Sequence, residues 1–423
     1  MRRRGRELAI ASVVAALAGA GTAQAAEPIQ IGFSMSLTGP FAVAGKQALI
    51  AMKLWQDDVN AKGGLLHRPV EFRYYDDQSN PANVPAIYTK LLDVDKVDLL
   101  VGPYGTVMTA PALPIVMTHH MVLTSFVSLN VNSRFHYDRY FSPTPLGASP
   151  IKDFSAGFFK VAMQQTPKPK TVAIVAADQE FAAQNVSGAI ENAKEAGLQV
   201  VYNEKYPPST TDFSPILQAV RARHPDIVYA ASYAPDSVGL VRAISELGYH
   251  PKMFGGATVG LTATPIEMQL GPELNGIVTF SAWEPLKPMM FPGVAHMLER
   301  YQQEAKREGV DPLGYAFAPA AYAYVQILGD AVQGAGTLDQ TKLAQYMHSH
   351  TFETVNGPLS FSKNGDALED RMLQIQYHGI TGHDLHQFDG PQHVTILWPT
   401  ELRTGGMIYP YAKAAEVGQA SAK

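Results

Sequence analysis

The chain has 423 residues, of which 46% are hydrophobic and 17% charged, and its formal net charge is −5. Roughly 400 residues exceed a typical single hydrophobic core, so two domains are expected. A mildly acidic chain without a polybasic cluster argues against nucleic acid and anionic lipid as partners. The sequence contains no cysteine, which excludes disulfide bonds, thiolate metal sites and a thiol nucleophile.

The first 25 residues have the order of a secretory signal peptide. Arginines at positions 2, 3, 4 and 6 precede an apolar run from Leu8 to Gly19, and Ala23-Gln24-Ala25 follows as a small-residue cleavage site. Cleavage after Ala25 removes four arginines and one glutamate, which changes the net charge from −5 to −8. The apolar run is too short to span a bilayer. We expect a soluble, periplasmic mature protein, exported by the general secretory route in preference to the twin-arginine route.

Short β-rich runs alternate with stretches of helical periodicity from residue 29 onward. Strands are expected at residues 29–37, 70–77, 97–103 and 121–126, and again at 171–178, 198–206, 226–233 and 252–256. Between the first two strands, Leu49, Met52, Trp55 and Val59 recur near a helical period, and Gly63 ends that helix. Strand, helix and strand at this spacing predict parallel βαβ units.

This βαβ series occurs twice, over residues 29–142 and 171–280. The proline-rich segment 142–150 between the two series is typical of an interdomain crossing. A long helical region that includes residues 319–336 follows, and short strands with turns are expected at residues 356–379. The last residues, 411–423, are expected to form a flexible tail.

Several sequence strings occur in a recognisable order along the chain. They are IGFSMSLTGPFAVAGKQ, VNAKGGLLHRPVEFRYYDDQSNP, VDLLVGPYGT, HPDIVYAASYAPDSVGLVRAISELGY, NGPLSFSKNGD and TILWPTELRTGG. In this order they resemble the periplasmic branched-chain amino-acid (Leu/Ile/Val) binding protein family, the type I solute-binding proteins of ABC transporters, over nearly all of the chain after residue 25. The resemblance implies an α/β fold with two Rossmann-like lobes that are joined by three crossover strands and close over a ligand.

The resemblance also implies that each lobe is discontinuous in sequence. Lobe 1 is expected to comprise residues 27–145 and 280–353, and lobe 2 residues 146–279 and 354–410. The three crossovers are expected near residues 143–150, 279–285 and 351–358. In such a fold the cleft lies at the carboxyl ends of the parallel strands, where helix N-termini offer free N–H groups to an anion.

In lobe 1 the resemblance implies a cradle for the ligand's carboxylate. Thr106 lies at the expected start of a helix, close to Tyr104, and the backbone of Phe126 and the hydroxyl of Ser128 follow the next strand. Such a cradle needs no lysine or arginine. From the residues alone, the alternative is that Thr106 only caps a helix and that Ser128 lies in an ordinary turn.

In lobe 2 the resemblance places Phe181 and Tyr233 over the ligand, and it makes Phe317 a candidate wall of the side-chain pocket. Aromatic side chains suit this position because they bring a large apolar area with few rotatable bonds. The alternative for each of the three is a place in the ordinary interdomain core.

The sequence departs from the family at the strand end around residue 257. Amino-acid binders of the family usually carry a glutamate there for the ligand's ammonium group, whereas this chain has Ala257 followed by Thr258. A buried ammonium without a carboxylate is costly. Either Asp178 or Glu180 replaces the glutamate, or the ligand is an organic or aromatic carboxylate without an ammonium group, which we favour. Ala44, where the family often has an aromatic residue, leaves room for a larger ligand.

Two other groups of residues have the composition of a chemical site. His378, His383, His386 and His393 fall within a short glycine-rich stretch and, with Asp384, have spacing that a zinc site could use, but surface turns explain them better. Asp76 and Asp77 are adjacent on a strand, so their side chains point apart, which favours loop and capping roles. We expect neither a metal nor a cofactor.

The function expected from the sequence is that of a monomeric transport receptor, which binds a small carboxylate and delivers it to the permease of an ABC importer. No phosphate loop, serine elbow or HExxH motif supports an enzyme. A sensor of the same fold is the first alternative, although no second membrane span or signalling helix is expected. A secreted hydrolase is the second, and it requires a base and a nucleophile within reach of each other.

Overall fold

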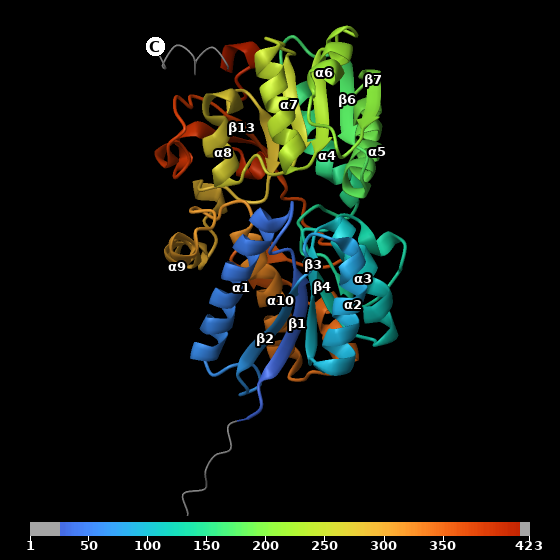
Figure 1. Cartoon of the computed structure of the whole chain (residues 1–423), viewed down its shortest axis with the longest axis vertical. Coiled ribbons are helices and arrows are strands. Elements are labelled where there is room, and N and C mark those ends of the chain that lie inside the picture. The colour runs from blue at the N-terminus through green and yellow to red at the C-terminus, as the bar shows by residue number, and fades with distance from the viewer. Residues whose placement is uncertain (1–25, 415–423) are drawn as a thin grey trace, which may run out of the picture.

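The computed structural model describes residues 26–414. The expected signal peptide and residues 415–423 of the expected tail lie outside the described residues. Two sheets organise the chain, one in each of two halves that lie one above the other (Figure 1). We call the half around the five-stranded sheet lobe 1 and the half around the seven-stranded sheet lobe 2. None of the helices described is long and apolar enough to cross a membrane.

The sheet of lobe 1 is parallel, with the strand order β2-β1-β3-β4-β5. Its strands are β1 (Ile29–Met35), β2 (Val70–Asp76), β3 (Leu99–Tyr104), β4 (Leu123–Phe126) and β5 (Tyr140–Phe141). The inner strands β1 and β3 are almost wholly buried, and in β3 this burial explains a sequence without any polar side chain except the hydroxyl of Tyr104.

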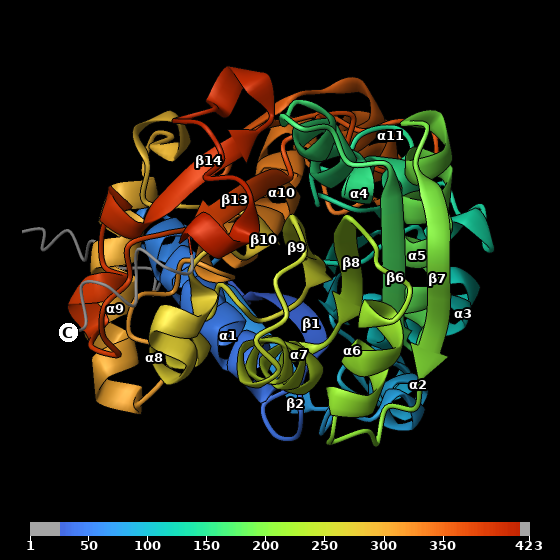
Figure 2. The same ribbon diagram turned by 90° about the horizontal axis from the view of Figure 1, so that it is seen from above.

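The sheet of lobe 2 has the order β14-β13-β10-β9-β8-β6-β7, which Figure 2 shows from above. Its strands are β6 (Thr171–Ala177), β7 (Gln199–Tyr206), β8 (Ile227–Ser232), β9 (Met253–Thr258), β10 (Val278–Ser281), β13 (Leu373–Tyr377) and β14 (Val394–Trp398). The run β7-β6-β8-β9-β10 is parallel and repeats the strand order of lobe 1, whereas β13 pairs antiparallel with β10 and β14 pairs antiparallel with β13. The predicted α/β fold with two Rossmann-like lobes is confirmed.

Helices cover both faces of each sheet, as right-handed βαβ connections require. In lobe 1, α1 (Ala42–Ala61) packs with α9 (Val294–Glu308) and α10 (Ala318–Ala335), α11 (Gln340–Ser349) packs on α10, and α2 (Val84–Thr89) packs with α3 (Thr106–Thr118). In lobe 2, α4 (Pro150–Met163) packs with α5 (Glu180–Glu195), α6 (Ser214–Arg221) with α7 (Ala234–Glu246), and α8 (Thr264–Leu270) beside α7.

The first and third connections between the lobes run side by side. The N–H of Ser142 donates to the carbonyl of Gly365 at 2.8 Å, and the N–H of Arg371 donates to the carbonyl of Pro145 at 2.9 Å. The hairpin β11 (Phe352–Thr354) and β12 (Gly357–Leu359) precedes this segment and contacts α10 of lobe 1. These contacts favour a third connection near residues 366–372, later than the 351–358 expected, and the exact lobe limits stay a prediction.

The end of the described chain packs against lobe 2. Tyr411 is only 4% exposed, its N–H donates to the carbonyl of Lys252 at 2.9 Å, and Ala414 is buried. The prediction of a flexible tail from residue 411 is therefore corrected for residues 411–414. Alanine-rich composition suggested disorder, but a single tyrosine in a crevice beside β9 anchors the segment.

Two buried glutamates lie where the second connection leaves lobe 2. Glu284 is 6% exposed and Glu267 in α8 is 7% exposed, and Tyr377 Oη donates to Glu267 Oε1 at 2.8 Å. Burial raises the pKa of Glu284 to about 8, and burial together with the charge of Glu284 raises the pKa of Glu267 well above its ordinary value. Both carboxyl groups therefore retain a proton over much of the range in which an exposed glutamate is ionised.

Gly365→Ala tests the contact between the first and third connections. Gly365 has φ +82°, and an added Cβ would lie 1.8 Å from the carbonyl oxygen of Tyr140. We expect the free energy of unfolding in urea to fall by about 3 kcal/mol. The control is Gly309→Ala, which has φ +64° but open space around the new Cβ and should cost about 1 kcal/mol. Equal losses would contradict the close approach.

Glu284→Gln tests the buried carboxyl group. Because its folded pKa of about 8 lies above the ordinary value of 4.5, the wild-type protein loses stability as pH rises through this window, whereas glutamine stays neutral. Relative to wild type, the variant should gain roughly 2–4 kcal/mol between pH 5 and pH 8 in urea unfolding. Glu299→Gln, on the exposed face of α9, is the control. A pH-independent difference between Glu284→Gln and wild type would contradict a protonated Glu284.

Candidate functional site

One large cavity lies between the lobes, where the carboxyl ends of the two parallel sheets face each other. It encloses about 1130 Å³, open solvent at its mouth included. Lobe 1 lines it with segments that follow β1, β3, β4 and β5, and lobe 2 with segments that follow β6, β8, β9 and β10. Ligands of open parallel sheets bind at this edge, beside the point where the strand order reverses. The arrangement of the two sheets alone therefore locates a candidate site, and no sequence motif is needed for this assignment.

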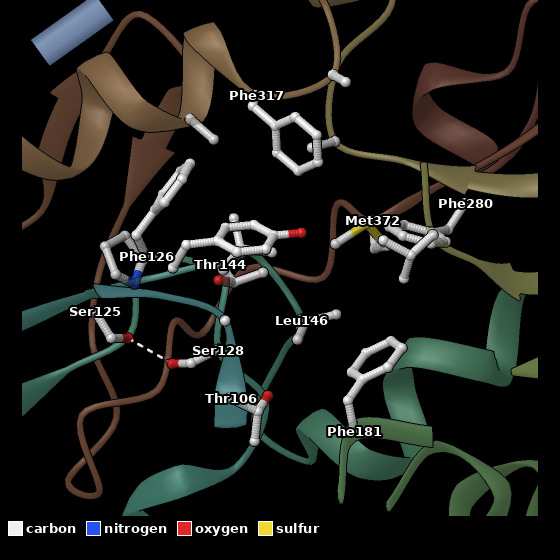
Figure 3. Close-up of a pocket in the computed structure, with 18 of the residues that line it drawn as sticks. Thr106, Ser125, Phe126, Ser128, Thr144, Leu146, Phe181, Phe280, Phe317 and Met372 are labelled. Atoms are coloured by element: carbon white, nitrogen blue, oxygen red, sulfur yellow. Dashed lines mark hydrogen bonds between the residues drawn. The ribbon is translucent and has the colours of Figure 1, made fainter. Parts of the chain in front are cut away.

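The first polar wall of the cavity is the N-terminus of α3. Gly105 precedes the helix with φ +82°, and open space surrounds the position that a Cβ would take. The first N–H groups of an α-helix have no partner within the helix, so they are available to an anion. Thr106 Oγ1 accepts from the N–H of Leu129 at 2.9 Å, which orients the hydroxyl and leaves its hydrogen free to donate. Figure 3 shows this hydroxyl at the cavity.

The second polar wall is a group of three buried hydroxyls. Ser128 Oγ lies 2.7 Å from Ser125 Oγ and 2.6 Å from Tyr140 Oη, and Tyr140 Oη lies 2.9 Å from Ser125 Oγ. Burial raises the pKa of Tyr140 to about 12, so its hydroxyl stays a neutral donor. The three hydroxyl protons are all used in the three hydrogen bonds of this group. A ligand that accepts a hydrogen bond from Ser128 must therefore replace one of these three hydrogen bonds.

Aromatic side chains form most of the remaining wall. In lobe 1, Tyr104 lies 5.8 Å from Phe41, 5.7 Å from Phe126 and 5.6 Å from Phe317, measured between ring centroids. Tyr233 of lobe 2 lies 6.1 Å from Phe41 across the cleft. Such pairs gain about 0.5–1.5 kcal/mol beyond their buried area. The lobes therefore meet through aromatic contacts that would enclose an apolar ligand.

A further aromatic pair lies within lobe 2. The rings of Phe181 and Tyr233 are 5.9 Å apart, and Phe181 also packs 5.5 Å from Phe154 of α4. Phe280 and Met372, from the second and third connections, complete this side of the cavity (Figure 3). This half of the cavity offers apolar surface and, from its side chains, little hydrogen bonding.

No acidic, basic or histidine side chain lines the cavity among residues 26–414. Asp178 Oδ1 lies 3.1 Å from Lys205 Nζ, and Glu180 Oε1 lies 2.7 Å from Arg134 in the other lobe, so neither acid replaces the missing glutamate at the wall. The buried Glu267 and Glu284 face a smaller adjoining cavity, which shares Thr262 with the large one. The large cavity can therefore satisfy an anion through neutral donors, but it offers no carboxylate to an ammonium group.

Two buried polar atoms at the cavity have no protein partner. They are Tyr233 Oη and Asn356 Oδ1. Burial raises the pKa of Tyr233 well above its ordinary value, so its hydroxyl remains protonated. Buried polar atoms in native proteins are almost always hydrogen-bonded. These two atoms mark positions where a ligand or an ordered water completes the site.

The structure brings seven of the nine predicted site residues to this one cavity. They are Tyr104, Thr106, Phe126, Ser128, Phe181, Tyr233 and Phe317. Ala257 and Thr258 do not line it, because both lie within the sheet, where Thr258 Oγ1 bonds to Thr279 Oγ1 of β10 at 2.7 Å. The loop that follows β9 contributes Val259, Gly260 and Thr262 instead. Whether the seven residues contact a ligand stays a prediction.

Sequence reasoning missed several lining residues. They are Phe41, Thr144, Leu146, Phe154, Phe280, Met372 and Asn356. A signal existed for three of them, since the first and second connections were expected at the cleft and their apolar residues could have been assigned to it. Asn356 had a similar signal, because it lies within the third connection expected at 351–358, whereas Met372 lies outside that range and had none.

The residues weighed for other chemistry lie elsewhere. His378 Nε2 lies 2.8 Å from Thr395 Oγ1 and His383 Nδ1 lies 2.9 Å from the carbonyl of Met268. Between residues 26 and 414, no three metal-binding side chains come together. Asp76 accepts from the backbone and hydroxyl of Thr38, and Asp77 accepts from the hydroxyls of Ser34 and Ser36, as loop and capping residues do.

Known proteins provide an independent comparison. The model of the periplasmic binding protein family matches residues 28–379. The leucine-, isoleucine-, valine-, threonine- and alanine-binding protein of Pseudomonas aeruginosa is 24% identical over 87% of this chain and 96% of its own length. The branched-chain amino acid transporter substrate-binding protein of Streptococcus pneumoniae, solved with isoleucine, is 19% identical, with a TM-score of 0.72 over 88% of this chain and all of its own.

Structures with aromatic ligands are similar to the same degree. A solute-binding protein of an ABC transporter from Rhodopseudomonas palustris, solved with 4-hydroxybenzoate, is 20% identical and covers 83% of this chain and 92% of its own, with a TM-score of 0.69. The resemblance seen in the sequence is confirmed, and the family match covers the residues that line the cavity and every strand of the two sheets except β14. The chain belongs to the periplasmic binding protein family.

Proposed function

We propose that the protein is a periplasmic solute-binding protein of an ABC importer and that its ligand is a small organic carboxylate without an ammonium group, in particular an aromatic acid. The observation that carries the proposal is the large interlobe cavity, which is lined by aromatic rings, hydroxyls and a helix N-terminus and by no charged side chain among the described residues. The ligand leaves the cavity chemically unchanged.

The carboxylate would bind at the N-terminus of α3. A helix N-terminus carries a partial positive charge and free N–H groups, so it stabilises an anion without a counter-ion. The hydroxyl of Thr106 adds a donor that the N–H of Leu129 already orients. Hydrogen bonds to an ionised group contribute about 1.5–3 kcal/mol each, so this wall can hold a carboxylate that has left water.

The body of the ligand would lie against the aromatic walls. Tyr104 and Phe41 of lobe 1 and Tyr233 of lobe 2 present rings to the same space. An aromatic ligand would bury apolar area against both lobes, which stabilises the closed arrangement relative to an open one. The ion pair between Arg134 and Glu180 also spans the lobes, but its exposure limits its contribution.

Relatives support both halves of the proposal. Similar proteins include amino-acid binders and, among solved structures, proteins with 4-hydroxybenzoate and 3,4-dihydroxybenzoic acid. The absence of a carboxylate from the cavity wall favours the second group over the first. We further propose that the protein acts as a monomer and delivers its ligand to the membrane permease of the transporter.

Thr106→Val tests the carboxylate cradle. Valine preserves the branched shape but removes the hydroxyl, so we expect the Kd for benzoate-class acids to rise about ten- to a hundredfold in calorimetric titration. The control is Thr118→Val at the other end of α3, whose hydroxyl bonds only to the carbonyl of Pro114. Wild type should bind one acid per chain, and mass spectrometry should recover it intact. Binding of sugars or amines alone, or conversion of the acid, would contradict the proposed function.

A further inference from the structure

The amide of Asn356 is a buried polar group that faces the cavity without a protein partner. The residue is 3% exposed and lines the cavity, and its Oδ1 is buried without a hydrogen-bond partner. Satisfied buried amides are the rule, and an unsatisfied one costs about 1–3 kcal/mol. Because Asn356 lines the cavity, a ligand there can supply the donor that Oδ1 lacks.

Hydrogen bonds and a tight turn fix the backbone around Asn356. The backbone therefore cannot shift to carry the side chain of Asn356 away from the cavity. Its N–H donates to Thr354 Oγ1 at 3.1 Å, and its carbonyl accepts from Arg371 at 3.1 Å. Gly357 follows with φ +91°, and a Cβ there would lie 2.9 Å from the ring of Phe291. Hydrogen bonds and the tight turn between β11 and β12 thus fix the amide at the cavity wall.

The chemistry of an amide selects its partner. The atom of Asn356 that lacks a partner is the acceptor Oδ1, so the group that satisfies it must donate a hydrogen bond, which a hydroxyl does. A carboxylate only accepts and would leave Oδ1 facing another oxygen. Asn356 also belongs to the hairpin that precedes the third connection, whereas Thr106 and Ser128 belong to the ends of β3 and β4. The two polar regions therefore suit two different groups of one ligand.

We propose that Asn356 is a specificity-determining residue that binds a hydroxyl substituent on the ring of the aromatic acid. This inference rests on the proposed function, because it assumes that the carboxylate of the same ligand occupies the N-terminus of α3. An unsubstituted ring leaves the amide of Asn356 unpaired, so the protein prefers the hydroxylated acid. Discrimination of this kind is strong because a buried polar group that lacks its partner is penalised in the complex.

Calorimetric titration of the full-length mature protein with benzoate, 3-hydroxybenzoate and 4-hydroxybenzoate tests the assignment. Wild type should bind the better of the two hydroxybenzoates about tenfold or more tightly than benzoate. Asn356→Leu, which has nearly the same shape, should lose that preference. Its Kd for the hydroxybenzoate rises about tenfold or more, while its Kd for benzoate stays the same or falls. Asn356→Ser is measured in parallel and should lose the preference for the hydroxybenzoate in the same way. It provides the test if the leucine variant does not fold.

The outcomes separate the assignment from the proposed function. If the variants weaken the binding of benzoate and hydroxybenzoate equally, or change the binding of neither, the assignment of Asn356 fails. In that case the residue has a structural role, and the proposed carboxylate site is unaffected. If wild type binds benzoate and the hydroxybenzoates equally, the assignment also fails. If wild type binds none of the three acids, both the proposed function and the assignment fail.

Discussion

The cost of burying a charge between two lobes is the constraint on which this site depends. An ion that leaves water must find a counter-ion or a set of oriented dipoles, since otherwise it stays in solution. At the large cavity the dipoles are present, in the N-terminus of α3 and the hydroxyl of Thr106, and a counter-ion for a cation is absent from its described wall. The sign of the charge that we propose the cavity accepts follows from this asymmetry.

The duplicated strand order explains why such a cavity exists. Both sheets contain the same parallel run of five strands, and each ends its strands at the interlobe face. Loops and helix N-termini from two domains therefore meet in one place, and polar groups of lobe 1 lie opposite aromatic groups of lobe 2. The connections that join the lobes also form part of the wall, since residues 143–146 and Met372 line it.

Much of this fold can be predicted from the sequence, because parallel strands buried on both faces leave continuous apolar runs. All eight expected strands lie within a few residues of observed ones, β1–β4 and β6–β9, whereas the two-residue strand β5 was not expected. The edge strand β14 and the path of the third connection are harder, since their positions depend on packing between distant segments such as Gly365 and Tyr140. The burial of Tyr411 also depends on contacts with distant residues, and no local sequence pattern indicates it.

The candidate site was predictable where a strand end or a helix start defined it. Thr106 follows a strand and begins a helix, and the fold brings it to the cavity as such positions imply. Ala257 and Thr258 were misplaced because one or two residues decide whether a side chain lies within the sheet or in the loop beyond it. Asn356 was missed because its importance appears only when its missing hydrogen-bond partner is known.

The most direct test of the account compares two acids that differ only by an ammonium group. Calorimetric titration at pH 7 with 3-phenylpropanoate and with phenylalanine measures the effect of the ammonium group on binding. The cavity wall offers no carboxylate to pair with this group. Because an unpaired buried charge costs about 3–5 kcal/mol, 3-phenylpropanoate should bind at least a hundredfold more tightly. Equal or tighter binding of phenylalanine would contradict the account, and it would direct attention to Glu267 and Glu284 beyond Thr262 as partners of the ammonium group.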